Sequence, residues 1–284
     1  MYIYYHIKRH IKKAFLFSFL LLIISPCIAS ENHTRVYTIG VVPQFEVKRL
    51  HAIWRPILKQ LELETGYHFN LRGAPNIPEF EEEFKKGQFD FAYMNPYHLI
   101  IANNSAGYIP LIRDHGRQLY GVLVVRKDSN IKDIHQLQNK VVAYPSPNAL
   151  GASLLMRQEL KDKFAVITHP EYVKTHDSVY LNVILGKASA GGGVQKTFNH
   201  LKPSYQKLLK IIYTTRKVAP HPLAVLPSVP KEVQDAVKKA FLKMGQTTSG
   251  KKLLEKIPIK QVGTAKMQDY KILNTLKLDR YTSR

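Results

Sequence analysis

The sequence predicts an α/β fold of two lobes, each a parallel sheet covered by helices on both faces. Short apolar runs, which indicate buried strands, alternate with segments of helical period from residue 36 onward. The alternation occurs in two successive series of about a hundred residues each, a size that supports separate cores. A hydrophobic fraction of 45% over 284 residues is typical of a globular protein and excludes disorder, collagen and coiled coil.

The first 29 residues have the pattern of an export signal. Basic residues precede an apolar stretch at 14–24, which is too short to span a bilayer. We expect cleavage after Ala29. Cys27 has a second interpretation, as the lipidated cysteine of a lipoprotein, but Pro26 stands where such proteins usually carry Gly, Ala or Ser. A single cysteine excludes an intramolecular disulfide framework and a Cys-rich zinc site.

The chain is strongly basic, with a formal net charge of +21. A basic surface can bind nucleic acid or an anionic membrane, attract anionic solutes, or simply keep a protein soluble. The lysines are spread along the chain without a helix-turn-helix, zinc-finger or RNA-recognition pattern, and an exported protein rarely meets nucleic acid. We therefore expect no nucleic-acid partner, and attraction of anions or plain solubility remains.

The first series of elements opens with a strand at 36–42, a nearly continuous apolar run of the kind buried on both faces. Apolar residues then recur at helical spacing and form one stripe of an amphipathic helix that Gly66 ends. These residues are Leu50, Ile53, Trp54, Ile57, Leu58 and Leu61. We further expect strands at 68–71, 89–94 and 108–112, a helix near Pro96, and an acidic helix from Glu79 whose carboxylates at 79–83 face solvent.

The second series has predicted strands at 120–125, 141–144 and 164–167 and helices near 131–137, 149–160 and 175–185. A tail adds strands at 211–213 and 223–226 and a helix at 233–244, followed by two helical stretches. The tail would complete the first lobe. The predicted organisation is thus a signal at 1–29, a first lobe at 30–116 plus 217–284, and a second lobe at 117–216. Crossings near 116–120 and 214–220 would form the hinge.

Motifs for catalysis and for cofactors are missing from the sequence. The segment AGGGVQKT at 190–197 lacks two glycines that a Walker loop needs, so its glycines are interpreted as a tight turn after a strand. That interpretation is favoured over a close approach of their backbone to an anion beside Lys196. No Gly-x-Ser-x-Gly or His-Glu-x-x-His pattern occurs. We expect no enzyme activity, no metal and no cofactor.

Four segments, taken in order, resemble one family. They are VVPQ at 41–44, FDFAYMNP at 89–96, residues 125–129 leading to Ser-Pro-Asn at 146–148, and THDS at 175–178. Together they resemble the periplasmic substrate-binding proteins of phosphonate, phosphite and phosphate importers, the PhnD-type family, over residues 36–228. The resemblance implies a type II periplasmic binding fold, each lobe a doubly wound sheet, which closes over one small anion. It also implies a monomer that delivers this anion to an ABC permease.

Helix starts that follow strands are the expected ligand contacts, because ligands of doubly wound sheets lie beyond the carboxyl ends of the strands. Unpaired amides and the helix dipole make such a start an anion site. The starts are at 95–97, 147–151 and 175–178. From these starts, the crossings and the resemblance we expect ligand contacts at Tyr93, Asn95, Tyr120, Asn148, Ala149, Leu150, Gly151, His176 and His221.

Several of these residues have a purely structural interpretation as well. His176 matches the family's ligand-contacting histidine, but a histidine in a first helical turn can equally cap the helix or be satisfied in the core. Tyr93, at the end of a buried strand, can pack in the core, and Tyr120, at a crossing, can pack the hinge.

The sequence departs from the family at two points. The family's Ser-Thr-Ser run, whose hydroxyls hold phosphonate oxygens, is matched here by Ala149, Leu150 and Gly151. Each lost charge-assisted hydrogen bond would cost about 1.5–3 kcal/mol, which leaves backbone amides and the nearby Ser146, Asn148 and Ser153 as donors. His221 stands where aminophosphonate binders of the family use an acidic residue, so an aminophosphonate ligand is disfavoured.

We therefore predict a periplasmic solute-binding protein for a small oxyanion of the phosphonate, phosphite or phosphate class. An alternative keeps the fold but makes the protein a ligand sensor that docks on a membrane-bound kinase or cyclase. A hydrolase on the same scaffold is a third alternative, disfavoured because no nucleophile–base pair is recognisable.

Overall fold

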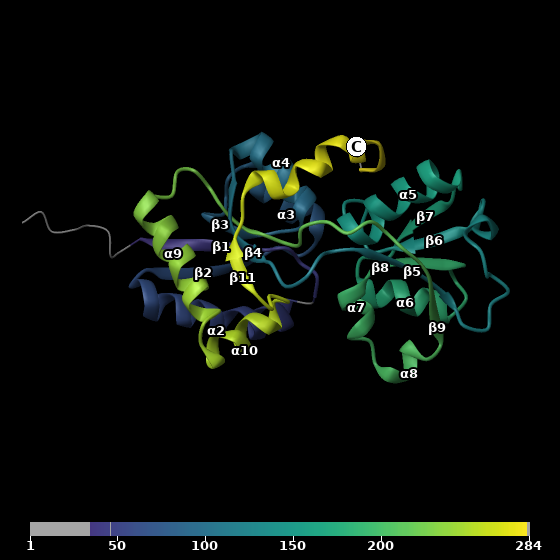
Figure 1. The fold of residues 1–284 in the computed structure, drawn as a ribbon, viewed down its shortest axis with the longest axis horizontal. Helices are drawn as coiled ribbons and strands as arrows, with labels where there is room; N and C mark the ends of the chain where they lie inside the picture. Colours follow the sequence, from purple (N-terminus) through teal and green to yellow (C-terminus); the bar gives the residue numbers. More distant parts are fainter. Residues whose placement is uncertain (1–34, 46, 283–284) are drawn as a thin grey trace, which may run out of the picture. The chain divides into compact units, whose positions relative to one another are not determined.

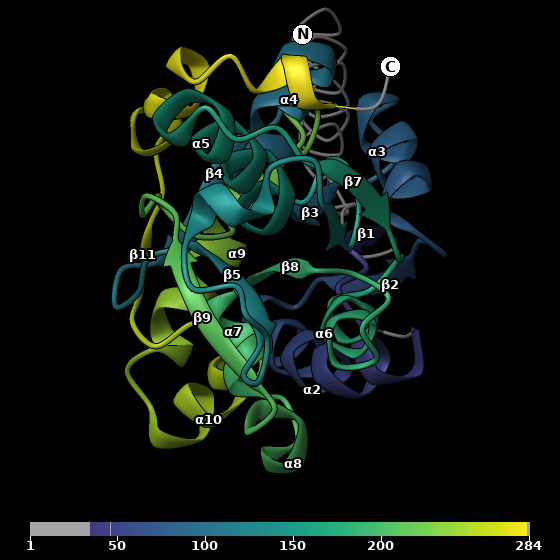
Figure 2. The same cartoon turned by 90° about the vertical axis from the view of Figure 1, so that its right-hand side faces the viewer.

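The computed structural model describes residues 35–45 and 47–282 of the chain. The predicted export signal, the cleavage after Ala29 and the alternative role of Cys27 lie outside these residues. The described part contains a six-stranded and a five-stranded sheet, shown in Figure 1 and, turned by 90°, in Figure 2. We call the six-stranded sheet with its helices the first lobe and the five-stranded sheet with its helices the second lobe.

The sheet of the first lobe is assembled from two distant parts of the chain. Its strands are β1 (Val36–Val41), β2 (His68–Gly73), β3 (Phe91–Tyr93), β4 (Ile109–Asp114), β10 (Leu223–Val225) and β11 (Val262–Thr264). Their order is β11-β4-β10-β3-β1-β2. β1 pairs in parallel with β2 and β3, whereas β10 runs antiparallel to β3 and β4. The expected all-parallel sheet is therefore wrong, because β10 enters from the other lobe and not through a crossover helix.

Helices cover both faces of this sheet, as predicted. The helices of the first lobe are α2 (Val47–Thr65), α3 (Ile77–Lys85), α4 (Pro96–Ala106), α9 (Lys231–Met244) and α10 (Thr248–Lys256). α2 buries Leu50, Trp54, Ile57, Leu58 and Leu61, most of the predicted stripe, against α9, α10 and one face of the sheet. α3 and α4 bury their apolar residues against the other face.

The second lobe is also a mixed sheet between helical layers. Its strands are β5 (Gly121–Arg126), β6 (Val141–Tyr144), β7 (His169–Tyr172), β8 (Ala190–Val194) and β9 (Leu209–Thr214), in the order β7-β6-β8-β5-β9. Its helices are η2 (Ile134–Leu137), η3 (Leu150–Leu154), α5 (Leu155–Phe164), α6 (His176–Ile184), α7 (Gln195–Asn199) and α8 (Pro203–Gln206). α5 and η2 pack on one face, α6 and α7 on the other. The short α7 and α8 were not predicted.

The predicted strand at 164–167 is wrong. Phe164 ends α5, and Ala165 follows in the left-handed region with a φ of 55°. The apolar side chains that suggested a strand, Phe164 and Val166, pack beside α5 in the core. The edge strand is β7, whose four residues are all exposed and therefore carry no apolar signal.

The predicted glycine turn at 191–193 is also wrong, because these glycines form the middle of β8. A Cβ on Gly191 would lie 2.6 Å from Cγ1 of Val179 on α6. A Cβ on Gly192 would meet the carbonyl oxygen of Ala152 and lie 2.5 Å from the ring of Tyr144. Helices and side chains thus approach β8 from both faces at a distance that only glycine allows.

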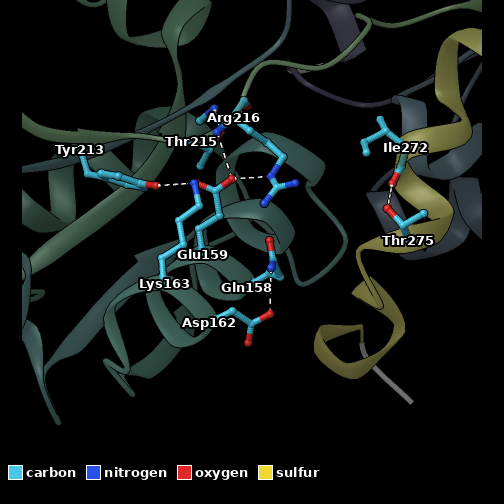
Figure 3. Close-up of polar contacts among 10 residues, drawn as sticks. Gln158, Glu159, Asp162, Lys163, Tyr213, Thr215, Arg216, Ile272 and Thr275 are labelled. Atoms are coloured by element: carbon cyan, nitrogen blue, oxygen red, sulfur yellow. Dashed lines mark hydrogen bonds and ion pairs between the residues drawn. The ribbon is translucent and has the colours of Figure 1, made fainter.

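Two crossings join the lobes, one between β4 and β5 and one between β9 and β10. Leu119 and Val218 pair antiparallel, and each amide donates to the other's carbonyl at 2.9 Å. The second crossing is fixed to α5 by Glu159, which is fully buried. Oε1 of Glu159 accepts two hydrogen bonds from Arg216, one from the backbone amide at 3.0 Å and one from the side-chain Nε at 2.7 Å (Figure 3). Oε2 of Glu159 accepts from the Tyr213 hydroxyl at 2.5 Å.

The tail contacts both lobes. It contains η4 (Met267–Thr275) and η5 (Leu278–Tyr281), and the bond from the Thr275 hydroxyl to the carbonyl of Ile272 closes the end of η4 (Figure 3). Apolar residues of the tail share one core with α4 and with η3 of the second lobe. Arg157 of α5 donates to the carbonyl of Tyr281 at 2.6 Å. The tail thus adds a contact between the lobes that was not predicted. The exact lobe boundaries stay a prediction.

No helix within residues 35–45 and 47–282 combines the length and the apolar character needed to cross a membrane.

Candidate ligand-binding site

Two adjoining cavities lie between the lobes, at the carboxyl ends of β1, β3, β6 and β8. The first, with a volume of about 30 Å³, is called the amide compartment, and its lining includes Asn95, Ala149, Leu150, Gly151, Thr175 and His176. The second, of about 60 Å³, is called the lysine compartment, and its lining includes Tyr93, Asp114, Arg117, Tyr120, Lys196 and Pro258. Gln44, Leu119, Val194 and His221 line both. Both cavities admit water-sized groups, so a small oxyanion fits this space.

The turn η3 forms one wall of the amide compartment. It follows β6, and its first backbone bonds run from the amides of Ser153 and Leu154 to the carbonyl of Ala149, at 2.8 and 3.2 Å. The amides of Leu150 and Gly151 precede these bonds and have no intrahelical acceptor. Both residues line the cavity, as does Ala149, so this wall offers backbone donors and no hydroxyl.

The start of α6 forms a second wall. The Thr175 hydroxyl accepts from the amide of Ser178 at 3.1 Å and caps the helix. His176 is 8% exposed, and its Nδ1 has no partner among the described residues. Burial, helped by the positive charge of Lys196, lowers the pKa of His176 to about 4. The ring is therefore neutral at pH 7, and His176 lines the amide compartment.

His221 lies between the two compartments and is held in its neutral form. Gln44 donates from Nε2 to Nε2 of His221 at 2.7 Å, which requires that ring nitrogen to carry no proton. Burial, helped by Lys196, lowers the pKa of His221 to about 3. Its ring stacks on Tyr93 with centroids 5.6 Å apart, and the Tyr93 hydroxyl donates to the carbonyl of Ile257 at 2.9 Å. Tyr93 thus supplies an aromatic wall, with its hydroxyl already bonded.

Two predicted contacts, Asn95 and Asn148, have their side chains occupied within the protein. Asn95 accepts from the amides of Tyr97 and His98 at the start of α4 and donates to the carbonyl of Asn148 at 3.2 Å. Asn148 lines neither compartment; its amide donates to the carboxylate of Glu81.

The hydroxyls of Ser146 and Ser153 are no substitute for the family's serines. Both residues are buried, and neither lines a compartment. Tyr120 lines the lysine compartment, and Nζ of Lys217 lies 5.7 Å from the centroid of its ring.

The prediction that the carboxylates at 79–83 all face solvent is wrong for Glu81. Glu79 and Glu82 are exposed, but Glu81 is 5% exposed and lies against the second lobe. His98 is fully buried, and its Nε2 lies 3.1 Å from Oε1 of Glu81. A charge run on a short helix gave no signal that one of its members faces inward.

Lys196 follows β8 and lines the lysine compartment, whereas the sequence analysis named it only in the disfavoured interpretation of the glycine segment as an anion site. The side chain is partly buried, and no carboxylate among the described residues forms an ion pair with it. Burial, with the nearby cations Arg117 and Arg49, lowers its pKa to about 8. A lysine directly after the carboxyl end of a strand was the available signal, but the glycine segment before it was interpreted as a turn.

The electrostatics of the two compartments favour an anion. The only acidic residue that lines either of them, in the described part of the chain, is Asp114. Its carboxylate accepts from the amides of Gly116 and Gln261, both at 2.9 Å, and from Nε of Arg117 at 3.1 Å. The charge of Asp114 is thus matched inside the protein, whereas that of Lys196 is not.

Comparisons with known proteins identify the family and the fold of the chain. The family model for "ABC transporter, phosphonate, periplasmic substrate-binding protein" matches residues 39–270. The chain is 25% identical over 268 residues to the "Phosphate-import protein PhnD" of Mycolicibacterium smegmatis, which covers 83% of this chain and 82% of that protein.

Two solved structures have a similar fold. One is a binding protein component of an ABC phosphonate transporter from Pseudomonas aeruginosa, with a TM-score of 0.77, 18% identity and 86% of each chain covered. The other is PhnD1 from Prochlorococcus marinus in complex with methylphosphonate, with a TM-score of 0.77, 18% identity, and coverage of 86% of this chain and 98% of that one. The fold is thus the predicted type II periplasmic binding fold. Since the family model spans most of the sequence, the chain belongs to the periplasmic substrate-binding proteins of phosphonate ABC transporters, a family of transport proteins and not of enzymes.

Proposed function

We propose that this protein captures a small oxyanion of the phosphonate, phosphite or phosphate class in the periplasm and delivers it, as a monomer, to an ABC permease. The observation that carries the proposal is the wall of η3, where Leu150 and Gly151, whose amides have no intrahelical acceptor, line the amide compartment. Asp114, the one acidic residue that lines the adjoining lysine compartment in the described part of the chain, is already paired with Arg117. Backbone amides at a helix start bind anions without any side-chain charge. Removal of a leader after Ala29 is part of the same proposal.

The histidines give the site neutral donors or acceptors beside these amides. A neutral imidazole can donate from one nitrogen or accept on the other, so His176 can bind either an ionised or a protonated oxygen of the ligand. The relatives named above support the ligand class, since one is a phosphate-import protein and another is bound to methylphosphonate.

Calorimetric titration with phosphate, phosphite and methylphosphonate tests the proposal, with sulfate and 2-aminoethylphosphonate as comparison compounds. We expect at least one of the first three to bind, and the aminophosphonate to bind more weakly than methylphosphonate. His176→Ala should weaken binding by about tenfold, since a hydrogen bond to a charged group contributes roughly 1.5–3 kcal/mol. His169→Ala, at an exposed position of β7, is the matched control. Absence of binding by every oxyanion would contradict the proposal.

A further inference from the structure

The two compartments offer different kinds of donor to a ligand. The amide compartment presents backbone amides of η3 and the neutral His176. The lysine compartment presents the ammonium of Lys196 and the guanidinium of Arg117. Because four residues line both, the compartments form one continuous site with two separate anion-binding ends.

The charge of Lys196 has no counterpart within the described part of the protein. The nearest acidic residue in its compartment, Asp114, is bonded to Arg117 and to two backbone amides. The Lys196 ammonium lies 5.4 Å from the centroid of the Phe45 ring, an aromatic contact that only partly replaces water. Taking a charge out of water is unfavourable unless an opposite charge is supplied.

The ligand is the remaining source of that charge. An aminoalkyl substituent would place a third cation beside Lys196 and Arg117. An uncharged substituent would cover the ammonium without neutralising it. An acidic substituent would do so, and the lysine compartment, with a volume of about 60 Å³, has space for one.

We infer that the protein selects an oxyanion that carries a second acidic group, with the oxyanion head on the amides of η3 and the second group on Lys196. The inference rests on the proposed function and specifies its ligand. The second group can be a carboxylate or a second phosphoryl group, since both present anionic oxygens to an ammonium.

Calorimetry with three probes separates these possibilities. Methylphosphonate has the head alone, phosphonoacetate adds a carboxylate, and pyrophosphate adds a second phosphoryl group. We expect phosphonoacetate or pyrophosphate to bind at least about tenfold more tightly than methylphosphonate, the effect of one charge-assisted contact. Whichever of phosphonoacetate and pyrophosphate binds more tightly identifies the second group as a carboxylate or a phosphoryl group.

Variants at Lys196 assign the preference to this side chain. Lys196→Met keeps the length of the side chain without its charge, and should abolish the preference while the affinity for methylphosphonate changes less than about threefold. Lys196→Arg should retain the preference. Lys217→Met is the matched control, because Lys217 is an exposed lysine beside the same compartment, and it should leave all three affinities unchanged. Circular dichroism checks that each variant is folded.

Three outcomes would overturn the inference. Equal binding of the three probes would show that no second group is recognised. If Lys196→Met lowered the affinity for all three probes equally, Lys196 would bind the oxyanion head itself. Absence of binding by all three, and by phosphate and phosphite, would remove the proposed function and the inference with it.

Discussion

The side-chain amide of Asn148 donates to both carboxylate oxygens of Glu81, at 2.9 and 2.7 Å, although the two residues belong to different lobes. Both are 5% exposed. Asn148 immediately precedes the turn that lines the amide compartment, and its carbonyl accepts from Asn95 of the first lobe at 3.2 Å. The first lobe therefore holds the segment that leads into the η3 amides, and contact between the lobes is coupled to the geometry of the site.

Asn148→Asp should separate the lobes and weaken ligand binding. It places a second carboxylate against Glu81 in a buried contact, where like charges repel strongly. We expect a larger radius of gyration by small-angle X-ray scattering and an oxyanion affinity at least about tenfold lower. Glu81→Gln keeps one acceptor and should have a smaller effect, and Glu82→Gln, at an exposed position of the same helix, should have none. An unchanged scattering profile with unchanged affinity for Asn148→Asp would refute the coupling.

Glu159→Gln should lower the free energy of unfolding by about 2 kcal/mol, since it weakens a buried, multiply bonded carboxylate whose partners are only partly exposed. Burial by itself would raise the pKa of Glu159, but bonds from Tyr213, Arg216 and Lys163 outweigh it and lower the pKa. The stabilisation is thus complete above the ordinary carboxyl pKa and is lost as the pH falls through the lowered value. Urea unfolding at pH 7 and at pH 4 measures the loss of unfolding free energy in Glu159→Gln and its dependence on pH. Glu255→Gln is the control, because Glu255 is exposed on α10.

The buried His176 should make the protein less stable in mild acid. Its pKa is lowered from 6.5 to about 4, so between these values the unfolded chain binds a proton that the folded chain does not. Stability should fall as the pH decreases from 6.5 to 4, by up to about 3 kcal/mol from this residue. His176→Asn should flatten the dependence of unfolding free energy on pH over that range, whereas the exposed His169→Asn should not. An equal slope in wild type and His176→Asn would contradict the assignment.

Ligand affinity should fall when the pH rises above about 8. An anion next to Lys196 raises its pKa from the value of about 8 in the free protein, so binding takes up a proton near pH 8. Arg117 and Arg49 lie near Lys196, and the neighbouring His176 and His221 stay neutral at this pH, since their pKa values are lowered to about 4 and about 3. Calorimetry at pH 8 in two buffers with different ionisation enthalpies measures the uptake, and Lys196→Met should show none.

Gly192→Ala should destabilise the second lobe by about 3 kcal/mol or prevent its folding, because the added Cβ would overlap the carbonyl of Ala152 and the ring of Tyr144. Gly73→Ala, where a Cβ would find only one side-chain atom at 4.0 Å, should change stability by less than about 0.5 kcal/mol. Thermal unfolding compares the two. Similar melting temperatures would show that β8 can shift away from η3.

The predictable parts of the site are those with a local cause. Asn95 precedes Pro96 at the start of a helix, and such a residue caps the helix wherever it lies in the fold. The η3 turn follows a strand whose apolar residues mark it, so its amides could be placed at a sheet end from the sequence. Lys196 has a local signal, its place after a strand, but the glycines of that strand were interpreted as a turn. Glu81 has no local signature. Glu81 is buried by Asn148, 67 residues away, and no periodicity reports a partner at that distance.

By itself, the sequence determined that the chain alternates strands and helices in two lobes and that helix starts converge where strands end, because apolar spacing and helix caps are properties of a few neighbouring residues. The tertiary structure alone decided that three glycines form a central strand, that Lys196 lines a cavity without an acidic partner among the described residues, and that Asn148 binds the opposite lobe. Each of these depends on which distant segment packs against the residue, and therefore on the burial and charge that only the assembled fold creates.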